Sequence, residues 1–463
     1  MVCSHNYGQR RGGMGSGGLW GPTRPPQRKA ATLSRCEASD NKRAPMSQNP
    51  NRPNMAITVL CGTLTSLVVI GFARLAYGII LPAMRADLGL SYQQAGILST
   101  VTALCYVCFV MAGGLAAARW GAKASVMFGM LTVTVGFLGL AVATPFWLVM
   151  FLMGLLGFGT AFAFAPMVAL LATWFPEQRG LVIGYMTSGV GISILVSGVL
   201  VPFLFDVFGD QGWRVSWGVF AAAALFVAVM IGLFVRNPPA PKARAAGHLP
   251  SEVKWRIYRN PRVLIVATTY GIIGLGYIVQ TVFMISFMVE SGHSETIAGR
   301  YMAMMGLLSI IGGPLWGWLS DFWGRGNALA MCIFLVLVAV ALPIIGQTLP
   351  YFFFHFLVMG ASVNGLFALI QTSATDQVAP RYIPIAFSFA TVFFAFGQFL
   401  GPAIAGWLIE TAGGFTAAFS FTFVVLSVGF GLTLLIRRFP KEYAVGEPKV
   451  GAVQSCEESE AVR

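Results

Sequence analysis

Arg74 stands out in this sequence because it interrupts the apolar run Ile70–Gly78. An arginine inside a membrane costs about 2.5–3.5 kcal/mol even on a lenient insertion scale, and such residues normally face a cavity or a partner. At 100° per residue, Thr63 and Tyr77 fall within about 60° of Arg74 on one helical face. Because a guanidinium binds a carboxylate through two parallel hydrogen bonds, this face predicts a site for an organic anion. Two other interpretations stay open: Arg74 extends toward the membrane surface, or it pairs with an acid such as Glu290.

A second group of polar residues lies inside later apolar runs. Its members, each a candidate for binding a substrate, are Tyr277, Gln280, His355, Asn364 and Gln398. Polar side chains also hold transmembrane helices together, so ligand contact and helix packing are both open for each of them. Embedded Asp, Glu and His are the usual groups of membrane proton relays, yet no Asp or Glu occupies the middle of an apolar run. His355 is the one embedded His, and by itself it favours a hydrogen-bonded packing role.

The composition excludes an ordinary soluble protein. Of 463 residues, 56% are hydrophobic and 10% are Asp, Glu, Lys or Arg, whereas soluble proteins carry about 25% charged residues. Between Ala56 and Pro440 there are only 18 basic and 10 acidic residues, which cannot cover a water-exposed surface. The chain is therefore predicted to be a polytopic membrane protein, with the lipid bilayer as a partner.

Several other classes of function are excluded. Much of the net charge of +13 comes from basic segments that flank apolar runs, which is typical of topology signals and not of a nucleic-acid surface. The seven cysteines show no zinc-type pairing, and Cys105 and Cys108 lie in an apolar run, where cysteine is usually a small packing residue. The P-loop pattern of nucleotide-binding proteins and any catalytic constellation are missing. We expect no ATP, no metal or other cofactor, no nucleic acid and no enzymatic activity.

Twelve apolar runs long enough to cross a bilayer, about 20 residues each, follow one another with short breaks. They are residues 56–81, 92–117, 124–143, 146–173, 180–204 and 213–236, and then 263–289, 295–319, 327–347, 350–374, 384–408 and 415–437. The fold class is thus an all-α membrane protein with twelve transmembrane helices as two six-helix repeats. The predicted domains are a disordered polar extension (1–54), an N-terminal half (55–236), a cytoplasmic connector with a short surface helix at 251–258 (237–262), a C-terminal half (263–438) and a cytoplasmic tail (439–463).

Basic residues predict the orientation of these helices. With the N-terminus inside, the inner loops carry twelve Lys or Arg, and the end of the last run with the segment after it carries five more, against three in the outer loops. Cytoplasmic loops are the ones enriched in Lys and Arg. Both termini are therefore expected in the cytoplasm.

The two halves share one internal spacing. The second run ends in a motif made of Gly114, Arg119, Gly121 and Lys123, and the eighth run ends in a motif made of Gly317, Asp321, Gly324 and Arg325. The two motifs lie 203 residues apart, and Pro176 and Pro380 repeat at 204. One spacing shared by two halves indicates a duplicated six-helix unit, as is common in secondary transporters.

From Ala56 to Pro440 the sequence resembles the major facilitator superfamily. The loop signature of that family is Gly-x-x-x-Asp-Arg/Lys-x-Gly-Arg/Lys, and both motifs fit it, except that Ala118 stands where the first copy usually has Asp. The resemblance implies that this acid helps to latch the halves in one state, so only Asp321 remains for that role. The segments Trp174–Leu181 and Gly397–Pro402 are similar to those of monocarboxylate and oxalate/formate porters.

The resemblance implies a secondary active or facilitated transporter that works by alternating access around a site between its halves. Arg74 favours a small organic anion, a carboxylate, as the substrate. Efflux of amphiphilic drugs or metabolites is the alternative, and a non-transporting membrane sensor on the same fold is a second one. We also expect a monomer in a bacterial inner membrane.

Overall fold

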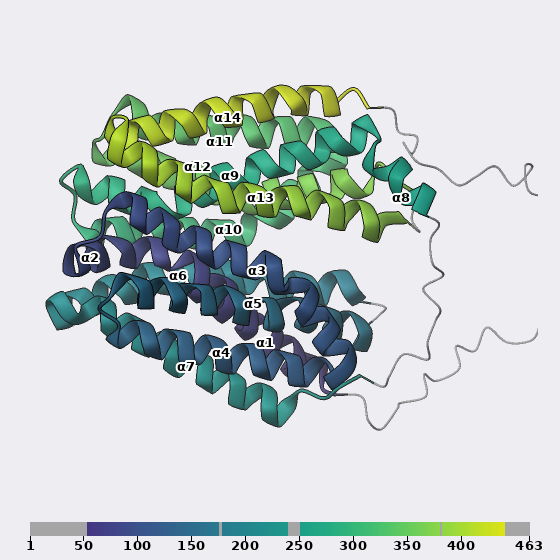
Figure 1. Ribbon diagram of the computed structural model, residues 1–463. Helices are drawn as coiled ribbons and strands as arrows, with labels where there is room; N and C mark the ends of the chain where they lie inside the picture. Colours follow the sequence, from purple (N-terminus) through teal and green to yellow (C-terminus); the bar gives the residue numbers. More distant parts are fainter. Residues whose placement is uncertain (1–52, 176–177, 239–250, 380–381, 440–463) are drawn as a thin grey trace, which may run out of the picture. The chain divides into compact units, whose positions relative to one another are not determined.

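The computed structural model describes residues 53–175, 178–238, 251–379 and 382–439, all within the unit Pro53–Arg463. In these ranges the chain forms helices and no β-strand (Figure 1). The helices are α1 (Met55–Ser66), η1 (Leu67–Leu75), α2 (Tyr77–Leu88), α3 (Tyr92–Trp120), α4 (Ala122–Val142), α5 (Phe146–Trp174), α6 (Arg179–Phe208), η3 (Gly209–Gln211), α7 (Gly212–Phe234), α8 (Ser251–Tyr258), α9 (Pro261–Glu290), α10 (Glu295–Trp323), α11 (Arg325–Ile345), α12 (Leu349–Thr375), α13 (Ile383–Thr411) and α14 (Gly414–Ile436). The predicted extension over 1–54 and the tail over 439–463 lie almost entirely outside the described residues.

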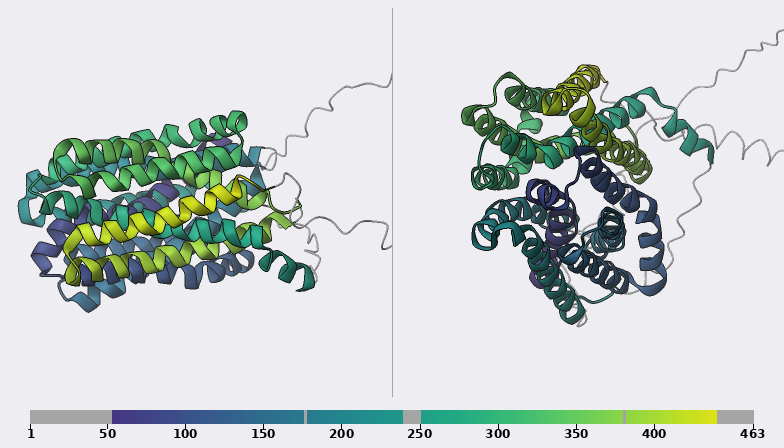
Figure 2. Two further views of the ribbon diagram at one scale, coloured as in Figure 1. Left: turned by 90° about the horizontal axis from the view of Figure 1, so that it is seen from above. Right: turned by 60° about the vertical axis from the view of Figure 1, so that its left-hand side comes forward.

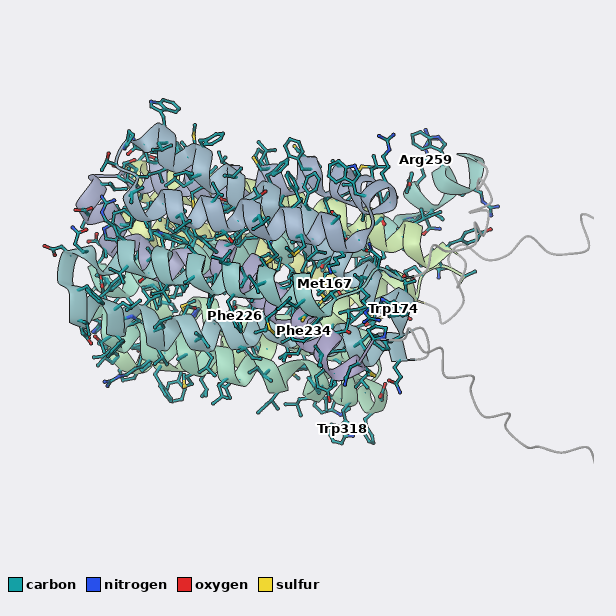
Figure 3. All side chains as sticks on the ribbon, turned by 90° about the horizontal axis from the view of Figure 1, so that it is seen from below. Met167, Trp174, Phe226, Phe234, Arg259 and Trp318 are labelled. Carbon is teal, nitrogen blue, oxygen red and sulfur yellow. The ribbon has the colours of Figure 1, made fainter. Side chains whose placement is uncertain are left out.

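The long apolar helices of the described residues can cross a membrane. Eleven continuous stretches meet this condition, and the longest, Leu181–Phe234, contains both α6 and α7, which η3 separates. Large apolar side chains project from the bundle, among them Trp318 of α10, which is 59% exposed (Figure 3). Such a surface is expected to face lipid and not water. The prediction of twelve transmembrane helices is confirmed, and α8 coincides with the short helix predicted in the connector.

The two halves, α1–α7 and α9–α14, repeat one pattern of helices and turns, and Figure 2 shows them as two groups of helices side by side. Gly121 joins α3 to α4 with a φ of 90°, and Gly324 joins α10 to α11 with a φ of 81°. Glycine adopts this backbone conformation without steric strain. Ser91 and Ser294 each cap the following helix by accepting a backbone N–H bond. Both pairs lie 203 residues apart, so the duplication inferred from the loop motifs is confirmed.

The halves contact each other toward one end of the bundle, which we call the closed end; it contains the turns after α2, α6 and α9 and lies on the left in Figure 1. There α2 packs against α9, α3 against α13 and α6 against α10. A Cβ atom on Gly198 of α6 would lie 2.6 Å from the backbone nitrogen of Ala303 on α10. Within the described ranges, every hydrogen bond, ion pair and close glycine contact between the halves lies near the middle of the helices or closer to this end.

The opposite end, with the turns at Gly121 and Gly324, we call the open end. A Cβ atom on Gly114 of α3 or on Gly317 of α10 would meet no atom within 4 Å. Met111 of α3 is 80% exposed. The two halves therefore contact each other toward the closed end, and these residues of α3 and α10 at the open end are not covered by the other half.

Candidate functional site

Arg74 lies where the two halves meet, and its partners carry no charge. Its Nη2 donates a hydrogen bond to Oε1 of Gln398 on α13, at 2.8 Å. Its guanidinium carbon lies 4.9 Å from the ring centre of Tyr106 on α3, which is a cation–π contact. Gln398 is 94% buried, and Arg74 is partly buried. A permanent positive charge therefore sits at the centre of the bundle among neutral groups.

The segment around Arg74 is a π-helix, η1, with hydrogen bonds along the backbone and to α5. The Ala76 N–H donates to the carbonyl of Gly71, five residues earlier. The Val69 carbonyl accepts a hydrogen bond from the Thr160 hydroxyl of α5, at 2.9 Å. This side-chain contact ties η1 to α5. π-Helical segments are rare and are frequent at functional sites.

Gln398 is placed by the close approach of α13 to α9. A Cβ atom on Gly397 would collide with the Gly271 carbonyl, and one on Gly401 would lie 3.0 Å from the Leu275 carbonyl. Small residues at both positions let the two backbones touch. The Gly397–Pro402 segment thus fixes the depth at which Gln398 reaches Arg74.

The prediction that Thr63, Arg74 and Tyr77 share one polar face is wrong. The Thr63 hydroxyl donates to the Tyr185 carbonyl of α6, and the Tyr77 hydroxyl donates to the Ala95 carbonyl of α3. The expected face assumed 100° per residue, whereas η1 winds with more residues per turn. Thr63 and Tyr77 therefore join helices of the N-terminal half, and Arg74 alone reaches α13.

An aromatic cluster continues the site into the C-terminal half. Tyr277 of α9 and Tyr106 lie close enough to interact electrostatically with Arg74. The Tyr277 ring meets Phe367 of α12 at 5.0 Å. Gln371 of α12 donates to the Tyr270 hydroxyl at 2.9 Å, and the Tyr270 ring stacks on Phe394 of α13 at 4.5 Å between centroids. Of the predicted residues in this half, Tyr277 and Gln398 are thus beside Arg74.

Gln280 and His355 line a separate small cavity between α9, α10 and α12, of about 20 Å³, which is room for about one water molecule. His355 has its Nδ1 2.7 Å from the Ala339 carbonyl; a carbonyl only accepts, so Nδ1 carries the proton and donates. Gln280 is 96% buried, and neither its amide nitrogen nor its amide oxygen has a partner among the described residues. Tyr277 lines the same cavity, so the cavity adjoins the Arg74 site.

Asn364 connects helices within the C-terminal half. Its Nδ2 donates to the Ser309 carbonyl of α10 at 2.6 Å. This contact is the helix-packing role that the sequence left open. Among the described residues, no hydrogen bond joins Asn364 to Arg74.

Other arginines at the helix ends are paired with acids. Arg85 contacts Glu290 at 2.9 Å across the two halves, and the Tyr92 hydroxyl donates to the same carboxylate oxygen at 2.8 Å. The interpretation that Arg74 pairs with Glu290 is thus wrong: the acid lies at the closed end, beyond the reach of η1. Arg214 contacts Asp87 at 3.1 Å within the N-terminal half.

The two loop motifs at the open end differ. Lys123 is anchored, because its Nζ donates to the Gly232 carbonyl at 2.7 Å and its backbone N–H donates to the Asn237 side chain at 2.8 Å. Arg119 and Asp321 are exposed. Arg325 pairs with Asp376 at the end of α12, and Asp321 forms no ion pair within the described residues.

Tyr106 is the site residue that the sequence did not reveal. It lies in an apolar run beside Cys105, and a tyrosine there gives no signal until the fold places it over the guanidinium. Within the described ranges, no three His, Cys, Asp or Glu side chains lie close enough together to hold a metal ion.

The chain matches a family model and several known proteins. Residues 66–434 match the model of the family described as "Uncharacterised MFS-type transporter YbfB". The chain is 24% identical over 362 residues to monocarboxylate transporter 12 of Xenopus laevis, covering 71% of this chain and 78% of that protein. It is 25% identical over 373 residues to the hexuronate transporter of Bacillus subtilis (strain 168), covering 75% and 86%.

Solved structures share the fold. A bacterial homologue of the human lysosomal transporter Spinster, in an inward-facing and unoccupied conformation, aligns with a TM-score of 0.68 at 18% identity, over 83% of this chain and 96% of that one. A mutant of the nucleoside transporter NupG aligns with a TM-score of 0.67 at 13% identity, over 83% and 98%. Because the family model spans most of its length, this chain belongs to the family of MFS-type transporters and is a multi-pass membrane protein that moves a small molecule, not an enzyme.

Proposed function

We propose that the chain transports a small organic anion, a carboxylate, that binds at Arg74. The observation that carries this proposal is the uncompensated charge of Arg74 at the meeting point of the halves, with an amide and an aromatic ring as its neighbours. Relatives named as monocarboxylate and hexuronate transporters support the same substrate class.

Among the described residues, the Arg74 guanidinium lacks partners for most of its N–H groups. An arginine offers five N–H donors, and within the described residues one hydrogen bond, to Gln398, is formed. A carboxylate can take two parallel donors at once and neutralise the charge. An occluded state that encloses a bare cation is costly, so a bound anion favours closure of the open end.

The aromatic cluster of Tyr277, Phe367, Tyr270 and Phe394 supports an apolar body for the substrate beside its carboxylate. The same cluster is what favours the alternative, efflux of an amphiphilic molecule. In that case the aromatic rings, and not Arg74, would carry most of the affinity.

We further propose that the open end faces the cytoplasm of a bacterial cell, with both termini inside and the protein acting as a monomer in the inner membrane. The support is the excess of basic residues in the loops at that end. On this orientation the contacts between the halves lie toward the outer side of the membrane, which is the arrangement of a state open toward the cytoplasm.

The test is uptake into proteoliposomes by the full chain, with a panel of radiolabelled carboxylates and the matched neutral amides. The expected result is uptake of an acid and not of its amide, and a loss of at least about 100-fold in Arg74→Ala, which removes two charge-assisted hydrogen bonds. Arg74→Lys keeps the charge without the planar fork and should transport weakly. Arg300→Ala, which removes an exposed arginine of α10, is the matched control and should transport normally. Uptake of neutral amphiphiles that is indifferent to Arg74→Ala would instead support efflux.

A further inference from the structure

A groove on the lipid-facing side of the C-terminal half runs between α11 and α14 and has a volume of about 410 Å³. Its lining is apolar along most of its length and polar at one end. The residues that line it are Trp323, Asn327, Ala330, Met331, Phe334, Phe430, Leu434 and Arg437. It is separate from the Arg74 site and serves no purpose in the transport argument.

The groove starts where a membrane-spanning helix ends. The span α14 finishes at Ile436, and Arg437 is its C-cap residue, so Arg437 marks the level of the membrane surface. From Arg437 to Phe430, and from Asn327 to Phe334, the groove covers seven residues of each helix, or about 10 Å at 1.5 Å per residue. A slot of this depth suits part of one acyl chain.

The charge at the mouth of the groove is positive. Arg437 is exposed, and no acid pairs with it among the described residues, whereas Arg325 nearby is already paired with Asp376. The backbone of Arg437 lies against Gly326, where an added Cβ atom would be 2.8 Å from the Arg437 Cα. The guanidinium is thus free above an apolar slot.

The repeated half of the same chain is built differently at this place. Position 326 corresponds to Lys123 at the spacing of 203, and the Lys123 ammonium donates to the Gly232 carbonyl near the end of α7. That contact bridges α4 and α7 at the level where α11 and α14 leave the groove. Because the second half has a glycine there, it has no equivalent of the lysine bridge, and Arg437 packs directly against Gly326.

We propose that this groove binds an anionic phospholipid of the bilayer, with one acyl chain between α11 and α14 and the phosphate at Arg437. An apolar slot that opens into lipid selects a chain, and basic sites between transmembrane helices at the membrane surface bind anionic headgroups. A zwitterionic lipid offers the same chain and no net negative charge, so it binds less well.

The test is native mass spectrometry of the full-length protein, delipidated and then reconstituted with equal amounts of phosphatidylglycerol and phosphatidylethanolamine of the same chains. The wild type is expected to retain phosphatidylglycerol preferentially, and Arg437→Gln to lose about fivefold of that preference. Arg438→Gln is the matched control, since Arg438 is equally exposed and does not line the groove. Met331→Trp, which fills the slot, should lower retention of both lipids.

Three results would overturn the proposal: equal retention of the two lipids by the wild type, the same loss in Arg437→Gln and Arg438→Gln, or displacement of the lipid by soluble glycerol phosphate as readily as by phosphatidylglycerol. The last result would mean that the mouth takes a free anion and the slot takes nothing. Melting curves without added lipid confirm that the surface variants fold.

Discussion

The arginine at the centre of the bundle and three arginines near its ends have different kinds of partner. Arg85, Arg214 and Arg325 each contact a carboxylate of the protein. Arg74 contacts an amide and a tyrosine ring, which leave its charge in place. For these three arginines the protein supplies a counter-charge of its own, and for Arg74 no described acid does so. The proposed transport site is therefore marked by the missing acid as much as by the arginine itself.

The difference between Arg74 and the paired arginines disappears if an acid is placed beside Arg74. In Gln398→Glu a carboxylate would stand where the amide oxygen now lies, 2.8 Å from the guanidinium, and would pair with it. We expect anion uptake to fall at least about 100-fold, because the substrate must then compete with a fixed partner. Gln398→Met, which removes one hydrogen bond and adds no charge, should lose about tenfold. Initial uptake rates in proteoliposomes measure both, and wild-type uptake by Gln398→Glu would show that Arg74 needs no counter-charge.

The role of the ion pair at the closed end can be tested by neutralising its acid. Glu290→Gln removes the ion pair with Arg85 and keeps an oxygen for the Tyr92 hydroxyl. Since Glu290 and Arg85 belong to different halves, the population open at this end should rise about fivefold, for an exposed pair worth about 1 kcal/mol. Distances between spin labels on α2 and α9 measure that population.

Asp87→Asn provides the control for that experiment. Its ion pair with Arg214 is similar in length but lies wholly within the N-terminal half. It should lower stability without changing the distances between the halves. Equal shifts in both variants would mean that the ion pairs act on folding alone.

A smaller effect is expected from the asymmetric loop motifs. Asp321 is exposed and forms no ion pair within the described residues, so the latching role that the family resemblance predicts for it would belong to the other state. Asp321→Asn should therefore raise the population of the present state by less than about fivefold and should act more strongly than Ala118→Asp. Spin-label distances at the open end, between α3 and α10, measure this change. An unaltered distribution in Asp321→Asn would identify the acid as a solvated loop charge.

The smallest effect concerns the unpaired amide beside the site. Gln280→Met should raise the free energy of unfolding by about 1 kcal/mol, because a buried amide without partners is costly. Gln371→Met, which removes a paired amide, should lower it by a similar amount. Thermal melts in detergent compare the two. Destabilisation by Gln280→Met would mean that an ordered water in the cavity already satisfies the amide.

The sequence predicted those parts of the structure that repeat. Gly121 and Gly324 sit at one spacing, and both adopt the positive φ that such turns require. The long apolar runs gave the number and order of helices, because about 20 apolar residues have one way to cross a bilayer. Arg74 was recognisable for the same reason: its burial in an apolar run is costly wherever the helix goes.

The partners of Arg74 could not be predicted in the same way. Gln398 lies 324 residues further along the chain, and only the close packing of α13 on α9 determines which side chain arrives there. The predicted polar face was wrong because a π-helix has more residues per turn than the α-helix that the sequence pattern assumes. Glu290 was a plausible partner of Arg74 because acids are few in the apolar runs. In the structure Glu290 lies at the end of α9 and pairs with Arg85.

The central claim is that the substrate supplies the counter-charge for Arg74, and ligand-dependent thermal stabilisation measures this most directly. A transported acid at 100 times its Kd should stabilise the wild type by about 2.7 kcal/mol, and the matched neutral amide should give no stabilisation. Neither compound should stabilise Arg74→Ala, while Arg300→Ala should respond like the wild type. A well-folded Arg74→Ala protein that the acid stabilises as much as the wild type would contradict the account.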